Sequence, residues 1–401
     1  MLDFKRKIIF DMDGVITAEE CYWNAAALTV WELLYGKHYL GLSPGEELPV
    51  FSAFPDTRDI SSIRRVIFQR DKVIAYFKQK AVNSNWDLAF LCFAFQLALI
   101  LKEFSRCGPE NKGFTCPAAK EGITPELLHD LSALLSLPDR SWKPSFESIL
   151  GEWTGNACGR DLPEKLALPF SGECLQIARK TFSPFSPLWE GVKDIFQEWY
   201  LGEINYKEIY AREPRLTGKK GLIEDEAPLL EINKIRATLD RLHNKGWILG
   251  IATGRPFSEL YLPLQKMGIW NYFDTDSIVT YDDVSKAEED LQGCLPQKIS
   301  LGKPHPFSFL KSYWGKSYSN SRMLSADGLQ PEKGKCWIVG DSMADLLAAR
   351  KMGALFIGVL TGHGGAESSR LFEKEGARAV LADMTEIPRF LEANGANIGD
   401  I

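Results

Sequence analysis

Two aspartates one residue apart are the part of this sequence best suited to chemistry. Asp11 and Asp13 follow a short apolar run and precede Gly14. One carboxylate of such a pair can attack phosphorus while the other protonates the leaving oxygen, and a hard cation can offset their charge. The pattern therefore indicates phosphoryl transfer through an aspartyl phosphate, with a plain surface turn as the alternative.

The residues before the two aspartates must position them. Residues 7–10 form a brief apolar run between charged residues and a turn, which predicts a buried parallel strand. Ligands of open α/β sheets bind beyond the carboxyl ends of the strands, and alternate residues of an extended segment face the same way. Asp11 and Asp13 can therefore point at one site, while Gly14 lets the chain turn away.

Two later segments also end in polar groups. A predicted strand over residues 248–252 is followed by Thr253 and Gly254, whose hydroxyl and backbone N–H can bind a phosphoryl oxygen. The alternative is an ordinary strand-to-helix cap. A lone lysine, Lys303, stands between a glycine and a proline, a setting that is also common on a solvated surface.

The last of these segments carries carboxylates again. A predicted strand over residues 337–339 leads to Asp341, and Asp345 follows at the start of a predicted helix. A helix cap at Asp341 or Ser342 is the alternative interpretation.

The four segments, in this order, resemble the four motifs of the haloacid dehalogenase-like (HAD) hydrolase superfamily. Residues 10–17 (FDMDGVIT) are most similar to the branch that includes β-phosphoglucomutase and phosphoglycolate phosphatase. The resemblance covers residues 1–16 and about 228–401 but not most of the block between them. It implies a Rossmann-like core and an Mg²⁺-dependent reaction on a phosphate ester.

The resemblance also implies the catalytic roles. Asp11 would be the nucleophile, Asp13 the general acid and base, and Lys303 the residue that neutralises the nucleophile and the phosphoryl group. Thr253 would complete the catalytic set. The groups that bind the phosphoryl oxygens would come from Met12, Asp13, Thr253, Gly254 and Lys303.

A metal site and one substrate contact follow from the same resemblance. Mg²⁺ would bind the carboxylates of Asp11 and Asp341 and the backbone carbonyl of Asp13. Asp345 would hold a metal-bound water, orient Lys303 or cap its helix. Arg255, directly after the phosphate-binding pair, is a candidate substrate contact, with an exposed surface arginine as the alternative.

Strands and helices alternate from residue 228 onward, which predicts an α/β fold with a doubly wound parallel sheet. Residues 17–227 read as mainly helical. The sequence thus predicts a catalytic core of residues 1–16 and 228–401, with a helical cap domain of residues 17–227 inserted after the first strand. Within the insertion, residues 61–82 are predicted as one helix capped by Ser61 or Ser62, and residues 202–225 as an irregular hinge or mobile loop.

The overall composition narrows the class of protein. The chain has 401 residues, a formal net charge of −6 and 45% hydrophobic residues, which is typical of a soluble globular protein and argues against a general nucleic-acid surface. No secretory signal is visible, and the longest apolar stretch, residues 88–101, is shorter than a membrane span. The eight cysteines are scattered, as in a reducing compartment. We expect a cytoplasmic protein with a phosphorylated small-molecule substrate and neither nucleic-acid nor membrane partners; the oligomeric state is left open.

Other activities remain as alternatives. A phosphomutase would return the phosphoryl group to substrate before water takes it. A dehalogenase is less consistent with the acid at Asp13, and a phosphonatase would need a Schiff-base lysine in the insertion, where no lysine is marked as buried. A different class is a non-catalytic binding or scaffold protein. One further segment stands out by its composition. Residues 313–335 are rich in Ser and Gly, and they could add a loop that contacts a substrate or a partner.

Overall fold

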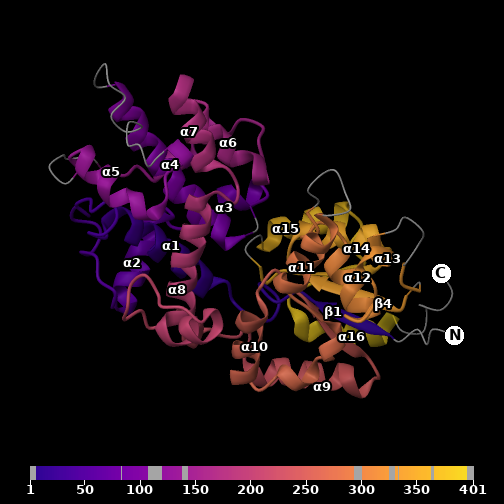
Figure 1. The fold of residues 1–401 in the computed structure, drawn as a ribbon. Helices are drawn as coiled ribbons and strands as arrows, with labels where there is room; N and C mark the ends of the chain where they lie inside the picture. Colours follow the sequence, from indigo (N-terminus) through magenta and orange to yellow (C-terminus); the bar gives the residue numbers. More distant parts are fainter. Residues whose placement is uncertain are drawn as a thin grey trace. The chain divides into compact units, whose positions relative to one another are not determined.

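The chain divides into two compact units, which we call the α/β unit, Met1–Glu19 with Glu226–Ile401, and the helical unit, Glu20–Asp225 (Figure 1). In the computed structural model the described residues are 6–82, 84–106, 120–137, 143–292, 300–324, 330–332, 334–362 and 365–394.

The α/β unit is built on one parallel sheet, with strand order β3-β2-β1-β4-β5-β6. The predicted α/β fold with a parallel, doubly wound sheet is confirmed. Its strands are β1 Lys7–Phe10, β2 Ile248–Ala252, β3 Ile278–Val279, β4 Cys336–Gly340, β5 Leu355–Val359 and β6 Ala379–Leu381. The first strand in the sequence is therefore central, and it pairs with β2 on one side and β4 on the other.

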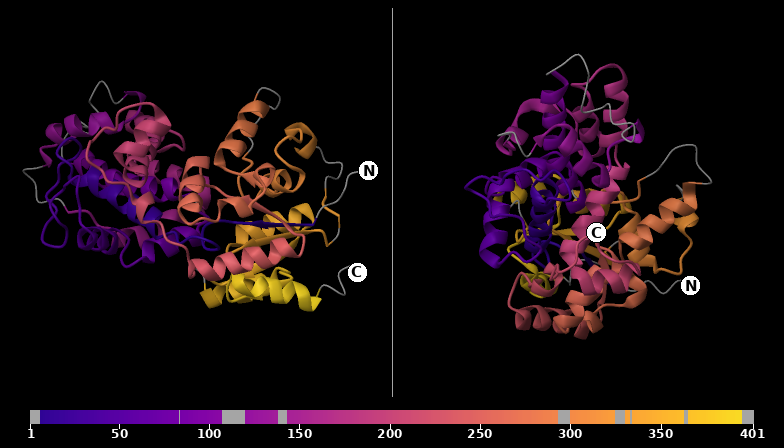
Figure 2. Two further views of the ribbon diagram at one scale, coloured as in Figure 1. Left: turned by 90° about the horizontal axis from the view of Figure 1, so that it is seen from below. Right: turned by 60° about the vertical axis from the view of Figure 1, so that its left-hand side comes forward.

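Helices cover both faces of this sheet. Alternate strand residues point to opposite sides, and the residues on both sides are apolar and buried. Ile8 and Phe10 of β1 pack into one hydrophobic cluster, and Ile9 packs into another. The first cluster includes residues of α9, α10 and α16, and the second includes residues of α12, α14 and α15; Figure 2 shows α9 and α16 beneath the sheet in its left view. The helices are α9 Ile232–Asn244, α10 Phe257–Lys266, α11 Tyr281–Gln292, α12 Phe307–Trp314, α13 Asn320–Leu324, α14 Met343–Met352, α15 Gly365–Lys374 and α16 Ile387–Asn394.

The segment predicted as a long loop, 313–335, is partly helical. It includes the end of α12 and all of α13, and Lys311 joins the two by donating to the Tyr318 carbonyl at 2.6 Å and to Asn320 Oδ1 at 2.8 Å. Residues 325–329 and 333 lie outside the described part of the chain.

The helical unit is organised around three long helices that pack on one another, α1, α4 and α8. Its α-helices are α1 Glu20–Tyr35, α2 Thr57–Ile67, α3 Lys72–Gln79, α4 Asn85–Arg106, α5 Leu128–Leu134, α6 Leu162–Ala167, α7 Gly172–Phe182 and α8 Pro187–Tyr210. By length and composition α4 could cross a membrane, but 78% of its apolar window is buried, as expected for the core helix of a soluble protein.

The prediction of one helix over residues 61–82 was wrong. Three consecutive residues, Gln69, Arg70 and Asp71, have positive φ and separate α2 from α3. The first of these helices is also capped earlier than expected. Asp56 accepts hydrogen bonds from the backbone N–H groups of Arg58 and Asp59 at 2.7 and 2.8 Å, so neither predicted serine caps it.

The segment predicted as a hinge or mobile loop, residues 202–225, is fixed by a close backbone crossing. Gly202 interrupts α8 with φ +76°. A Cβ on Gly202 would lie 2.4 Å from the Lys220 carbonyl, and one on Gly221 would lie 2.5 Å from the Leu201 carbonyl. Two glycines are needed for the chain to return so closely along α8.

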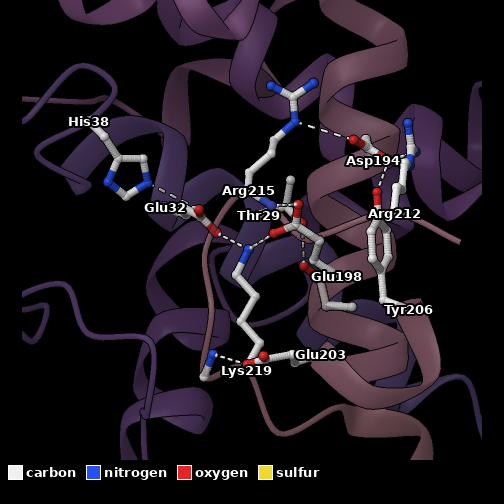
Figure 3. A network of polar contacts seen from close by, with 12 residues as sticks. Thr29, Glu32, His38, Asp194, Glu198, Glu203, Tyr206, Arg212, Arg215 and Lys219 are labelled. Carbon is white, nitrogen blue, oxygen red and sulfur yellow. Dashed lines mark hydrogen bonds and ion pairs between the residues drawn. The ribbon is translucent and has the colours of Figure 1, made fainter. Parts of the chain in front are cut away.

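The same segment carries a lysine buried between two acids, which we call the Lys219 cluster. Lys219 is fully buried, and its Nζ lies 2.7 Å from Glu32 Oε2 on α1 and 2.6 Å from Glu198 Oε2 on α8 (Figure 3). It also lies 4.8 Å from the Trp199 ring centroid. The sequence marks no lysine of the insertion as buried, yet the structure buries Lys219.

Candidate active site

The ends of β1 and β4 position the first two carboxylates. The Asp11 N–H donates to the Val339 carbonyl at 2.8 Å, so the β1–β4 ladder extends through Asp11. The Asp11 carboxylate is held locally, because its Oδ1 accepts from the Met12 N–H at 2.7 Å. Asp341 follows β4 directly, and the parallel ladder therefore brings both aspartates to the same edge of the sheet.

Three carboxylates meet at this edge. Oxygens of Asp11, Asp341 and Asp345 all lie within 4.8 Å of one another. Two glycines make room for Asp341: a Cβ on Gly14 would lie 2.3 Å from its Oδ2, and one on Gly362 would lie 1.9 Å from the same atom. The chain is thus shaped around the carboxylate, and a side chain at either glycine would displace it.

Asp345 has two structural partners. Ser342 is the N-cap of α14, and its Oγ donates to Asp345 Oδ2 at 2.6 Å in a reciprocal capping box. The other oxygen, Oδ1, lies 2.8 Å from Lys303 Nζ. Two of the predicted alternatives for Asp345, capping the helix and orienting the lysine, therefore both hold in the structure.

Lys303 connects the third motif to the first and the fourth. Its Nζ lies 2.9 Å from Asp11 Oδ1 as well as 2.8 Å from Asp345, and 4.8 Å from the Phe309 ring centroid. Burial alone would lower the pKa of Lys303, but the two carboxylates favour the ammonium and hold the pKa above its ordinary value. The lysine is thus a fixed positive charge beside Asp11.

One ammonium does not balance three acids. Burial and the charges of Asp345 and Asp13 together raise the pKa of Asp11 to about 7, although Lys303 acts in the opposite direction. Carboxylate oxygens are the ligands that Mg²⁺ prefers, so the cluster fits a divalent cation in both donor type and charge. Asp11 and Asp341 would hold it, with Asp345 close by; the backbone carbonyl of Asp13 as a ligand stays a prediction.

Asp13 pairs with a different cation, Arg255. Both of its carboxylate oxygens lie 3.1 Å from Nε of Arg255. Arg255 is only 2% exposed, so the alternative of an exposed surface arginine was wrong. An unpaired buried charge is strongly destabilising. The Asp13 carboxylate therefore stabilises the buried guanidinium of Arg255 by pairing with it.

The remaining predicted phosphate-binding groups lie at the neighbouring strand end or directly after Asp11. Thr253 is 2% exposed, and its Oγ1 accepts from the Arg255 N–H at 3.2 Å, so the hydroxyl helps to form the local turn. Gly254 is exposed, whereas the Met12 side chain is fully buried, which leaves only the backbone of Met12 for binding. Their roles toward a phosphoryl group stay predictions.

Sequence reasoning missed several supporting residues. Glu226 and Glu259 bind Arg255 through a carboxylate and a backbone carbonyl, and Thr361 Oγ1 donates to the Gly14 carbonyl at 2.6 Å. None of these residues lies in one of the four motifs. Thr17 is different, because it is the last residue of the first motif and could have been noticed in the sequence. Its Oγ1 accepts from Arg255 Nη2 at 3.0 Å.

Known proteins support the same superfamily. Residues 300–387, which include Lys303, Asp341 and Asp345, match a family model described as HAD-hydrolase-like. An X-ray structure solved as a Northeast Structural Genomics Consortium target is 33% identical, with a TM-score of 0.77, over 97% of this chain and 98% of that chain. No curated protein matches the chain.

Two more distant solved structures are also similar to this chain. One is a hydrolase from Pseudomonas syringae, with 16% identity and a TM-score of 0.37 over 97% of this chain and 98% of that chain. The other is a HAD family hydrolase from Deinococcus radiodurans R1 with bound phosphate and sodium, with 14% identity and a TM-score of 0.38 over 98% of this chain and 97% of that chain.

Proposed function

Because this chain belongs to the haloacid dehalogenase-like hydrolase superfamily, we propose that it is a Mg²⁺-dependent phosphatase acting on a small-molecule phosphate monoester. The observation that carries the proposal is the meeting of Asp11, Asp341 and Asp345 with Lys303 at one edge of the sheet. Three segments far apart in the sequence thereby supply the charges that a phosphoryl group requires.

Asp11 is the best nucleophile of the three acids. Asp345 is fully buried, its Oδ2 accepts from Ser342 Oγ at 2.6 Å and its Oδ1 lies 2.8 Å from Lys303 Nζ, so it is the least accessible of the three acids to a substrate. Among the described residues, both contacts of the Asp11 carboxylate use Oδ1, which leaves Oδ2 to attack phosphorus. Asp341 follows the neighbouring strand and suits the cation instead.

The proposed reaction has two steps. Asp11 attacks phosphorus in line, the bond to the leaving oxygen breaks, and Asp13 gives that oxygen its proton. Asp13 then takes a proton from the water that attacks the aspartyl phosphate, which releases phosphate and restores both acids. Lys303 stays charged beside Asp11 throughout, and a bound Mg²⁺ would offset the charge of the acids and the phosphoryl group.

The helical unit is proposed to act as the cap, which would exclude bulk water and read the leaving group. Its buried lysine does not favour a phosphonatase. A Schiff base needs an accessible neutral amine, whereas Lys219 is enclosed and paired with two carboxylates. A cytoplasmic location and a phosphorylated small-molecule partner belong to the same proposal.

A panel of phosphate esters tests the proposal. Phosphate release should require Mg²⁺, stop with EDTA and disappear in Asp11→Asn. Activation by a sugar bisphosphate, without net phosphate release, would identify a phosphomutase instead. An inactive wild-type protein across the panel, with no Mg²⁺ binding, would support the non-catalytic scaffold.

A further inference from the structure

Arg255 is a buried arginine whose guanidinium is fully engaged by protein partners. Its Nε lies 3.1 Å from both oxygens of Asp13, and its Nη2 lies 2.5 Å from Oδ1 of the same carboxylate. The other N–H groups donate to Glu226 Oε2 at 3.1 Å, the Glu259 carbonyl at 3.2 Å and Thr17 Oγ1 at 3.0 Å. A guanidinium has five N–H donors, so each one has an acceptor within the α/β unit.

Two of these partners lie where the chain leaves and re-enters the α/β unit. Thr17 belongs to the stretch after β1, and Glu226 is the first residue after the helical unit. These two stretches pair with each other, because Thr17 forms an isolated antiparallel bridge with Pro228. Arg255 therefore bonds one side chain from each crossing, and both are buried.

This arrangement does not suit a substrate contact. To bind a phosphate, Arg255 would have to release a two-point contact with Asp13 or its buried pair with Glu226, and either loss would leave a carboxylate short of its partner. Asp13, in contrast, keeps 24% of its side chain exposed while the arginine beneath it is 2% exposed. The arginine is the fixed member of the pair, and Asp13 is the one with access to the surface.

We propose that Arg255 is a positioning residue that orients the Asp13 carboxylate for proton transfer, and that Glu226 and Thr17 fix Arg255 in turn. The inference rests on the proposed function, in which Asp13 protonates the leaving oxygen. The planar guanidinium holds both carboxylate oxygens, whereas a lysine could hold only one point.

The orientation of a general acid matters most when the leaving group is a poor one. A good leaving group departs without full protonation, so a displaced Asp13 costs little. Arg255→Lys should therefore lower kcat for phenyl phosphate by about 10- to 100-fold, part of what a complete general acid contributes. For 4-nitrophenyl phosphate the same variant should lose at most a few-fold.

Glu226→Gln gives a second variant that removes one charge and keeps the shape of the side chain. It should change the ratio of the two substrates in the same direction by a smaller factor. Arg350→Lys is the matched control, because Arg350 is 58% exposed and pairs with Glu375 on the surface. This control should leave the ratio at the wild-type value.

Three results would overturn the proposal. An equal loss on both substrates would mean a purely structural role. A raised KM with unchanged kcat would mean a substrate-binding arginine. No change on either substrate would mean that Asp13 needs no such support.

A separate readout distinguishes this proposal from the proposed function. If the wild-type protein hydrolyses neither ester, the phosphatase assignment fails, but the pairing can still be tested by thermal unfolding. The Tm shifts of Asp13→Asn and Arg255→Lys should then be non-additive in the double variant, whereas additive shifts would reject the pairing.

Discussion

Lys303 and Lys219 each lie between two carboxylates, and they differ in what surrounds them. Lys303 in the α/β unit joins Asp11 and Asp345, and its side chain is 15% exposed. Lys219 in the helical unit joins Glu32 and Glu198, and all three side chains are fully buried. The same set of charges thus occurs both at the end of a sheet and within a bundle of helices.

The two clusters differ in how many acids surround the lysine and in whether a ligand can reach the carboxylate oxygens. Beside Lys303 a third acid, Asp341, lies within reach, and two glycines leave space around it. In the Lys219 cluster the remaining oxygens are already used: Glu198 Oε1 accepts from the Arg215 N–H at 2.7 Å, and Glu32 Oε1 lies 3.3 Å from His38 Nε2. A charged cluster indicates a site for a ligand when it is incomplete, and a structural role when it is satisfied.

The largest expected effect separates the two clusters by activity. Asp11→Asn should lower kcat on any phosphate ester by about 10⁴-fold or more, because the nucleophile is lost. It should not lower the free energy of unfolding, because it removes a buried charge. Glu32→Gln makes the same chemical change in the Lys219 cluster and should keep kcat while lowering the Tm. Full activity in Asp11→Asn would end the assignment of the nucleophile.

A second test separates them by stability. Lys219→Met leaves two buried carboxylates without their ammonium and should lower the free energy of unfolding by about 3–5 kcal/mol, with kcat per folded molecule unchanged. Adding Glu32→Gln and Glu198→Gln to this variant removes the unpaired charges and should restore most of the loss. Urea denaturation of the three proteins measures both effects. An unaffected Lys219→Met would show that the cluster contributes nothing to stability.

A third test compares how much Mg²⁺ stabilises variants of the two clusters. At 100-fold excess over its dissociation constant, Mg²⁺ should stabilise the wild-type protein by about 2–3 kcal/mol, since it binds only the folded site. The variant Lys219→Met should gain the same increment, whereas Asp341→Asn should gain almost none. Thermal unfolding with Mg²⁺ and with EDTA checks this. An equal gain in Asp341→Asn would place the cation elsewhere.

A fourth effect depends on pH and concerns Asp11, and per pH unit it is smaller than the effects above. Its pKa in the folded protein is raised to about 7 from an ordinary value of 3.8, so without metal the folded state binds more protons than the unfolded state between these values. Stability from this group is therefore full below its ordinary pKa and is lost as the pH rises through about 7. The slope should approach about 1 kcal/mol per pH unit.

The comparison that isolates this effect is between the wild-type protein and Asp11→Asn, because every other titrating group is shared. Their difference in unfolding free energy, measured in EDTA at several pH values, should grow with pH up to about 7 and then level off. Saturating Mg²⁺ should abolish it, since the cation binds the carboxylate form. A constant difference would show that Asp11 titrates normally.

The sequence predicts the part of the site that lies at strand ends. The runs before Asp11 and Asp341 are short, apolar and bounded by turns, and a parallel sheet then brings their ends together. The burial of Arg255 and of Lys219 was not predicted, because their partners are far from them in the sequence. Nothing local in Glu226 or Glu198 indicates that a cation will be buried against it. The break between α2 and α3 was missed for another reason, since left-handed residues other than glycine and asparagine have no reliable sequence signal.

The central place of β1 in the sheet has a consequence for the order of events during synthesis. This strand leaves the ribosome first, yet both of its neighbours are translated more than about 200 residues later, a delay of about 10–40 s at ordinary elongation rates. The helical unit is contiguous in the sequence and is complete before either neighbour exists. An apolar strand must therefore wait, unpaired, while another part of the chain acquires its structure. Chaperone capture of stalled nascent chains should accordingly be strongest before residue 252 has emerged and weaker once β4 is available.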